Sequence, residues 1–159
     1  MSDITILELV TQQAEKLVFN SLSIIGKLTE VRLQSQIANN KIKNLKLRLQ
    51  HLESSDESLR PLFLEKHIEK VKQEIFILEY QSSTLDKLLN DLITMLTGDL
   101  GKHMDDLRVK INAMSAGIPL DALAPSYWAV VNKIKYDLDK VCSEVIDMQL
   151  VCKKHTFFY

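Results

Sequence analysis

The sequence predicts an all-α protein: a long antiparallel coiled-coil hairpin, then a shorter C-terminal helix. Apolar residues recur at alternating intervals of three and four over most of the chain, which is the period of a left-handed coiled coil. Only four glycines and three prolines occur among 159 residues, whereas sheet proteins use both in their many turns. Leu, Ile, Val, Lys, Glu and Asp dominate, and aromatic residues make up 6%. This composition is typical of long helices.

The first helix is expected over residues 3–52, with Asp3 as its N-cap. Gly26 lies inside it and is expected to weaken or bend the helix locally. Fourteen positions form its apolar seam, the row of side chains that faces another helix, and twelve of them are apolar. They are Leu7, Val10, Ala14, Leu17, Ser21, Ile24, Leu28, Val31, Ser35, Ala38, Ile42, Leu45, Leu49 and Leu52.

The second helix is expected over residues 59–114, after a short polar link at 53–58. Pro61 stands where a first-turn proline is favoured. Its seam is Leu64, Ile68, Val71, Ile75, Leu78, Ser82, Leu85, Leu89, Leu92 and Leu96, then Leu100, Met104, Leu107, Ile111 and Met114. The spacing slips after Leu96, where Gly98 and Gly101 stand, so a bend near 98–101 is predicted. Because the link is short, the two helices are expected to form one antiparallel hairpin over residues 1–114.

A linker is expected at residues 115–125, where Gly117, Pro119 and Pro125 gather. The C-terminal helix and an aromatic tail then occupy residues 126–159, with Ser126 as the cap. This helix has two apolar rows, so it is expected to pack against more than one helix. The rows are Tyr127, Val131, Ile134, Leu138, Val141, Val145, Met148 and Cys152, and Val130, Cys142, Ile146 and Leu150.

No pattern of catalytic or cofactor-binding residues stands out. The N-terminus lacks a positive region, so no secretory signal is expected, and no apolar run approaches the ~20 residues of a membrane helix. Cys142 and Cys152 lie outside any metal-binding spacing, and no nucleotide-binding or hydrolase motif occurs. The histidines at 51, 67, 103 and 155 form no recognised ligand spacing. We therefore expect a chain that is not an enzyme and needs no cofactor or metal.

Two groups of polar residues have alternative interpretations. Lys41, Lys43, Lys46 and Arg48 form a basic run that either contacts an anionic polymer or is the solvated face of the first helix. The second interpretation is favoured, because acidic residues follow at 53, 56 and 57 and the net charge is only −1. Among seam residues, Ser21, Ser35 and Ser82 either set the register of helix pairing or are tolerated small side chains.

The N-terminal half of the first helix is expected to bind other chains. The second helix covers the first only from about residue 52 back toward Gly26, and the last helix is too short and begins too late to cover the rest. Apolar residues there would then face water in an isolated chain. The aromatic tail either anchors a partner or folds back on its own bundle. The predicted partner-binding residues are Leu7, Val10, Leu17, Phe19, Ile24, Phe157, Phe158 and Tyr159.

Two proline-marked junctions resemble a known family. The first follows QIANNKIKNLKLRLQHLESSDES and reads LRPLFLEKHIEKVKQEIFILEYQSSTLDKLL, with Pro61, Phe63, Leu64 and Lys66. The second is IPLDALAPSYWAVVNKI, with Ile118, Pro119, Leu120 and Tyr127. Over about residues 28–138 the chain resembles the second subunits of the augmin (HAUS) complex, although it is short for that family.

The resemblance implies a non-catalytic coiled-coil subunit of a hetero-oligomer. Augmin binds existing microtubules and recruits the γ-tubulin ring complex, so that new microtubules branch from old ones in the mitotic spindle. The microtubule contact is attributed to neighbouring subunits. The implied setting is the cytoplasm and cytoskeleton, at the spindle and centrosome of dividing cells, without a small-molecule substrate, membrane or nucleic acid. Alternatives are a subunit of a kinetochore or vesicle-tethering complex, or a homodimeric scaffold.

Overall fold

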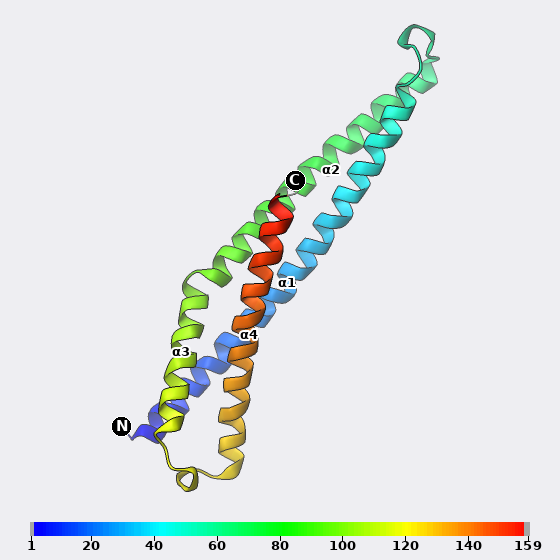
Figure 1. The fold of residues 1–159 in the computed structure, drawn as a ribbon. Coiled ribbons are helices and arrows are strands. Elements are labelled where there is room, and N and C mark those ends of the chain that lie inside the picture. The colour runs from blue at the N-terminus through cyan, green and yellow to red at the C-terminus, as the bar shows by residue number, and fades with distance from the viewer. Residues whose placement is uncertain (1, 158–159) are drawn as a thin grey trace. The chain divides into compact units, whose positions relative to one another are not determined.

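The chain is built from helices in a computed structural model, which describes residues 2–157 and the side chains of residues 2–150. Four long helices, α1 (Asp3–Leu52), α2 (Leu62–Thr97), α3 (Asp99–Ala116) and α4 (Pro125–Phe157), follow one another along the chain (Figure 1). Short 3-10 helices, η1 (Glu57–Leu59) and η2 (Leu120–Ala122), lie in the links. The described residues contain no strand, and the predicted all-α class is confirmed.

The cap of α1 and the starts of α2 and α4 differ from the expected ones by one to three residues. Ser2 caps α1 in place of Asp3, because the Ser2 hydroxyl accepts a hydrogen bond from the Thr5 amide at 3.2 Å. Pro61 precedes α2, and its carbonyl accepts from the amide of residue 65 at 3.2 Å. The helix α4 begins at Pro125, in the first-turn position that suits a residue without an N–H. Ser126 is therefore not its cap.

The predicted bend near 98–101 is a break between two helices. α2 ends at Thr97, and Gly98 has a ψ of −128°, which is not helical. Its amide still donates to the Thr94 carbonyl at 2.9 Å, and its carbonyl accepts from Lys102 at 3.1 Å. A Cβ at Gly98 would lie 2.9 Å from the Thr94 oxygen, and one at Gly101 would overlap the carbonyl oxygen of Leu96. The break thus depends on backbone that passes where a side chain would stand.

The same glycine-to-alanine substitution should have opposite effects at two sites. Gly26→Ala is expected to raise the free energy of unfolding by about 0.5–1 kcal/mol, because Gly26 is in a helix interior and a Cβ meets nothing within 4 Å. Gly101→Ala is expected to lower it by about 1–3 kcal/mol, because the backbone of Leu96 must shift. Urea unfolding followed by circular dichroism measures both. Equal stability of the two variants would contradict the role of Gly101.

The chain divides into two compact units, and the first comprises residues up to Lys27 together with those from Leu92 onward. In this unit α3 and α4 lie side by side and run in opposite directions (Figure 1). The Arg108 guanidinium on α3 pairs with Asp105 at 2.6 Å and lies 3.6 Å from Asp139 on α4. The N-terminal part of α1 packs on α3, where the Ser21 hydroxyl donates to the Met104 sulfur at 3.0 Å. Its fully buried side chains include Leu7, Leu96, Met104, Ile111, Val131, Leu138 and Val141.

The second unit comprises residues 28–91, the later part of α1 and most of α2. Lys46 pairs with Glu79 at 2.9 Å, and Lys72 lies 3.6 Å from Glu53. Glu53, just after α1, meets an earlier residue of α2 than Lys46 does, so the two helices run antiparallel. In the link, the Arg60 guanidinium donates to the carbonyls of residues 53 and 55. Apolar side chains from both helices form the buried core, which includes Leu28, Val31, Ile42, Ile68, Val71, Ile75 and Leu89.

Candidate partner-binding surfaces

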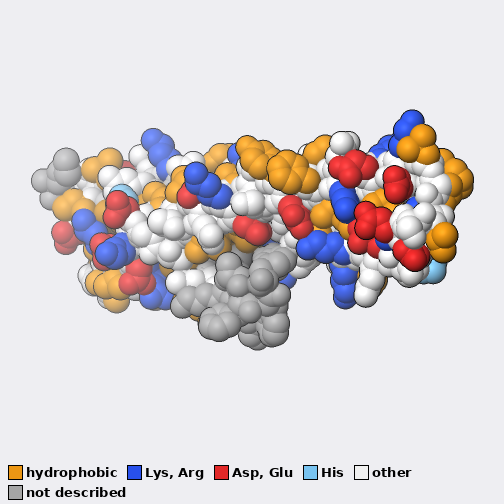
Figure 2. Space-filling model, turned by 90° about the horizontal axis from the view of Figure 1, so that it is seen from above, with side chains coloured by type: hydrophobic (Ala, Val, Ile, Leu, Met, Phe, Trp, Pro, Cys, Tyr) orange, Lys and Arg blue, Asp and Glu red, His pale blue; other side chains and the backbone are white. Residues whose placement is uncertain are grey.

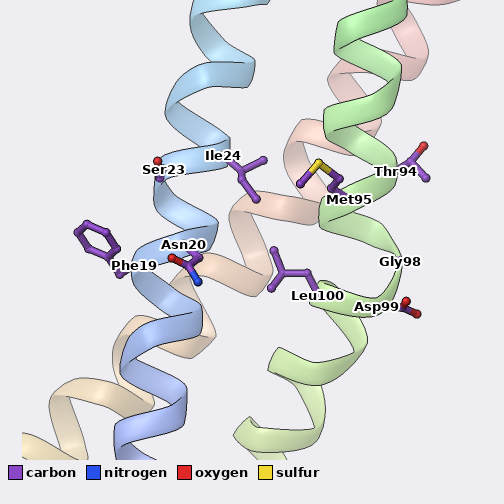
Figure 3. Close-up of a pocket in the computed structure, with 9 residues that line it drawn as sticks. All are labelled: Phe19, Asn20, Ser23, Ile24, Thr94, Met95, Gly98, Asp99 and Leu100. Atoms are coloured by element: carbon purple, nitrogen blue, oxygen red, sulfur yellow. The ribbon is translucent and has the colours of Figure 1, made fainter.

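A groove of about 850 Å³ opens in the first unit between α1 and the junction of α2 with α3. We call it the junction groove. Its lining residues are Phe19, Asn20, Ser23 and Ile24 on α1, and Thr94, Met95, Gly98, Asp99 and Leu100 on the other side. Figure 3 shows Ile24 and Met95 pointing toward one another across the gap, with Leu100 below them. Phe19 and Asp99 lie at the two outer edges. The groove therefore has an apolar floor and one charged lining residue.

The helix break explains why this groove exists. Met95 is in the last turn of α2 and Leu100 in the first turn of α3, so the two lie on opposite sides of Gly98. Both point into the space facing α1 (Figure 3). Met95 remains 53% exposed, and Leu100 is half-buried. An exposed Met in a groove suits binding of other side chains, because its unbranched thioether adapts to irregular surfaces.

The predicted partner-binding residues of α1 fall into two groups. Leu7 is 0% exposed and Val10 is 4% exposed, so the expectation that they face water in the isolated chain is wrong. Residues 1–27 form one compact unit with residues 92–159, a grouping that the seam spacing alone could not show. Leu17 and Ile24 are half-buried, and Phe19 is 73% exposed. Only the last three remain candidates for contact with another chain.

The predicted aromatic tail lies beyond the side chains that the structure describes. Phe158 and Tyr159 lie outside the described residues, and Phe157 ends α4 without a described side chain. Both interpretations of the tail stay predictions.

Further apolar side chains are exposed in the second unit, and they are not among the predicted partner-binding residues. Phe76, Ile77 and Tyr80 lie on α2, and a shallow hollow of about 380 Å³ is lined by the first two with residues 69, 72 and 73. Exposed apolar residues on α1 are Leu33, Ile37 and Leu47. Figure 2 shows apolar side chains at the surface among acidic and basic ones on the face in view. The signal in the sequence was weak, because Leu33 and Ile37 are four apart outside the seam, but Asn40 and Asn44 separate them from Leu47 in the same spacing.

A polar layer crosses the core of the second unit. The Ser35 hydroxyl donates to the Asp86 carboxylate at 2.9 Å, and the Ser82 hydroxyl donates to the Asn39 side-chain oxygen at 2.7 Å. The Asn39 amide also lies 3.5 Å from the Ser35 oxygen. Ser35 and Ser82 are buried. These bonds join α1 to α2 at one alignment, which favours the interpretation that the seam serines set register.

Part of the basic run interacts with α2. The Lys46 ammonium pairs with Glu79, and the Arg48 guanidinium lies 3.2 Å from the His67 ring. Lys41 and Lys43 are exposed. The run is thus divided between contacts inside the second unit and solvent, as the solvated-face interpretation expects.

The second proline-marked junction, which contains Pro119, is a turn held by a hydrogen bond across it. The Trp128 indole N–H donates to the Leu120 carbonyl at 2.8 Å, which ties η2 to the start of α4. A hollow of about 620 Å³ beside it is lined by residues 115, 116, 120, 125, 128, 129, 132 and 135. Leu120 itself is exposed. The turn therefore presents an apolar side chain to solvent from a fixed backbone.

Two half-buried titratable groups have raised pKa values. Burial raises the pKa of the Cys142 thiol, and Arg108 nearby lowers it by a smaller amount. Burial also raises the pKa of Tyr127, and the charge of Glu8 adds to this. The Tyr127 hydroxyl has no hydrogen-bond partner. A thiol that stays protonated at neutral pH is a weak nucleophile.

Neither a metal cluster nor a membrane span is found in the part of the chain that the structure describes. No three His, Cys, Asp or Glu side chains there are placed to hold a metal ion. Within the same residues, no helix is both long and apolar enough to cross a bilayer. No protein-family model, curated protein or solved structure matches the chain.

Proposed function

We propose that this chain is a non-catalytic structural subunit of an augmin-type complex, assembled from helices of several chains. In this proposal the antiparallel helices of the second unit form a coiled-coil hairpin that other subunits extend. The complex would bind spindle microtubules and recruit the γ-tubulin ring complex, so that new microtubules nucleate there. The chain would act in the cytoplasm, at the spindle and centrosome, through its contacts with other subunits.

The observation that carries the proposal is the unpaired apolar surface. Large apolar side chains are exposed at Phe19 and Met95, at Leu33 and Leu47, and at Phe76 with its neighbours. Burying one such side chain fully contributes about 1.5–3 kcal/mol, and grouped exposed apolar residues mark protein interfaces. Because these groups lie on helices, partner helices are the natural cover. The junctions at Pro61 and Pro119 direct the proposal to augmin rather than to another coiled-coil complex.

The test is to express the chain alone and together with candidate augmin subunits. We expect the chain alone to self-associate into heterogeneous species, and the co-expressed chain to elute in one complex of defined mass by light scattering. A soluble, cooperatively melting monomer from the chain alone would contradict the need for partners. A well-defined homodimer would instead favour the scaffold alternative.

Cellular location and partners provide the second arm of this test. In dividing cells, a tagged chain is expected on the spindle, and its purification should yield other augmin subunits by mass spectrometry. A triple variant, Leu33→Asp, Leu47→Asp and Phe76→Asp, should lose these subunits because charges replace exposed apolar contacts. The matched control changes three exposed polar residues outside the hollow, Asn44→Asp, Gln50→Asp and Gln81→Asp. Equal recovery with both variants would remove the support that these surfaces give.

A further inference from the structure

We infer that the junction groove binds an amphipathic helix of a partner chain that carries acidic residues along the flank facing α1. This inference rests on the proposed function and names the kind of partner segment that one surface takes. It concerns only the first unit, in which both walls of the groove lie.

The walls favour a helix over other occupants. The α1 wall presents Phe19, Asn20, Ser23 and Ile24, which occupy one side of two successive turns. A docked helix presents a ridge of side chains at positions i, i+3, i+4 and i+7. This ridge fits between the α1 row and the facing turn at Met95. An extended peptide binds by adding to an exposed sheet edge, and the described residues contain no strand.

The floor determines what the inserted face must be. Ile24, Met95 and Leu100 point into the gap, and Phe19 stands at its α1 edge (Figure 3). Ile24 and Leu100 are only half-buried, so a side chain placed between them removes more apolar surface from water. Asn20 and Ser23 are short polar side chains at the rim, and they can remain hydrated or donate to the occupant. The inserted face is therefore apolar, with Leu, Ile or Met side chains.

The charges on the α1 side of the groove determine which residues the docked helix carries on the flank that faces α1. Lys16 lies one turn before Asn20, and Lys27 lies one turn after Ser23, so both extend the wall that lines the groove. Both lysines are exposed, and no ion pair between described residues involves either. They stand eleven residues apart, about 16 Å along the helix at 1.5 Å per residue. Glutamates about eleven residues apart on the docked helix would face both ammonium groups.

The opposite edge of the junction groove carries a negative charge. Asp99 is the charged residue among those that line the groove, and it begins α3. A docked helix with a Lys or Arg on its second flank would meet this carboxylate. The two edges together orient the partner helix about its own axis, because rotation by half a turn brings like charges together.

Two designed helical peptides of 21 residues test the inference. Both have the same Leu row, and one carries Glu toward the α1 side and Lys toward Asp99, whereas the other has these charges exchanged. The full-length chain is immobilised at low density, which prevents self-association during the measurement. We expect the first peptide to bind at least about tenfold more tightly, since several rim charge pairs change sign. The preference should decrease as salt is raised from 0.05 to 0.5 M, because the rim charges are exposed.

Variants of the chain show where the peptides bind. Lys16→Glu with Lys27→Glu should reverse the preference, whereas Lys110→Glu with Lys133→Glu, an equal change of net charge at exposed sites outside the groove, should preserve it. Met95→Glu should abolish binding of both peptides, because it places a charge on the apolar floor. Circular dichroism verifies that each variant keeps its helix content.

The outcomes separate this inference from the proposed function. Equal binding of the two peptides, or binding that Met95→Glu does not change, overturns the inference. Co-assembly with augmin subunits can succeed in that case, and the proposed function then stands without this groove. Conversely, peptide binding with the expected charge preference supports the groove even if those subunits fail to co-assemble.

Discussion

Replacing Leu7 by Ala is expected to lower the free energy of unfolding by about 2–5 kcal/mol, the range for a buried Leu. Replacing Phe19 by Ala should change it by less than about 0.5 kcal/mol, as is usual for surface positions. Both residues lie on α1, twelve positions apart, and both were candidates for contact with other chains. Leu7 is 0% exposed and Phe19 is 73% exposed, so the first stabilises the chain and the second is available to a partner.

Two measurements check the pair. Urea unfolding followed by circular dichroism gives the stability of each variant, and co-purification with partner subunits gives its assembly. Phe19→Ala should weaken assembly at nearly unchanged stability. Leu7→Ala should affect assembly only as far as it unfolds the chain. A Leu7→Ala chain as stable as the parent would show that Leu7 is not buried within the first unit, and would restore it to the partner surface.

The positions of the helices could be predicted because burial follows the helical period. The seam of α1 continues from Leu7 to Leu52 without a proline, and the structure has one helix over Asp3–Leu52. The polar link and Pro61 located the turn for the same reason. The break at Gly98 could not be distinguished from a bend, because it depends on where the carbonyl oxygens of Thr94 and Leu96 lie. The sequence shows two glycines, and only the backbone shows that a Cβ would collide.

The partner surface was harder to predict than the fold. A seam residue such as Val10 looks the same in the sequence whether a helix of its own chain or of another chain covers it. The junction groove combines Ile24 with Met95 and Leu100, which are more than seventy residues away along the chain. The division into two units was equally hidden, since the apolar seams continue across both boundaries, between residues 27 and 28 and between residues 91 and 92. The sequence contains only a short trace of the exposed surface, the pair Leu33 and Ile37, four residues apart and outside the seam.

The polar layer affects the alignment of α1 with α2 more than it affects the stability of the second unit. A coiled-coil seam repeats every seven residues, so sliding one helix by seven positions again places apolar residues opposite apolar ones. In the second unit that slide would separate Ser82 from Asn39 and Ser35 from Asp86, leaving buried polar groups unpaired. Each unpaired buried group costs about 1–3 kcal/mol. The hydrogen bonds thus favour one register by penalising the others.

Making this layer apolar should keep the fold stable but abolish its single register. The variant combines Ser35→Ala, Asn39→Leu, Ser82→Ala and Asp86→Leu. Its stability should match or exceed the parent by about 1–4 kcal/mol, because buried polar groups contribute little net stability. Spin labels at Lys43→Cys and Glu65→Cys, both exposed positions of the second unit, report the alignment, with Cys142→Ala and Cys152→Ala removing the native thiols.

Distances between the two spin labels then decide the question. The parent layer should give one narrow distance by electron paramagnetic resonance. The apolar layer should add a second population displaced by about 10 Å, the length of seven residues at 1.5 Å each. The control, Thr84→Ala on the exposed side of α2, removes a hydroxyl without touching the layer and should keep the single distance. If the apolar layer also keeps one narrow distance, the surrounding ion pairs, such as Lys46 with Glu79, must hold the register instead.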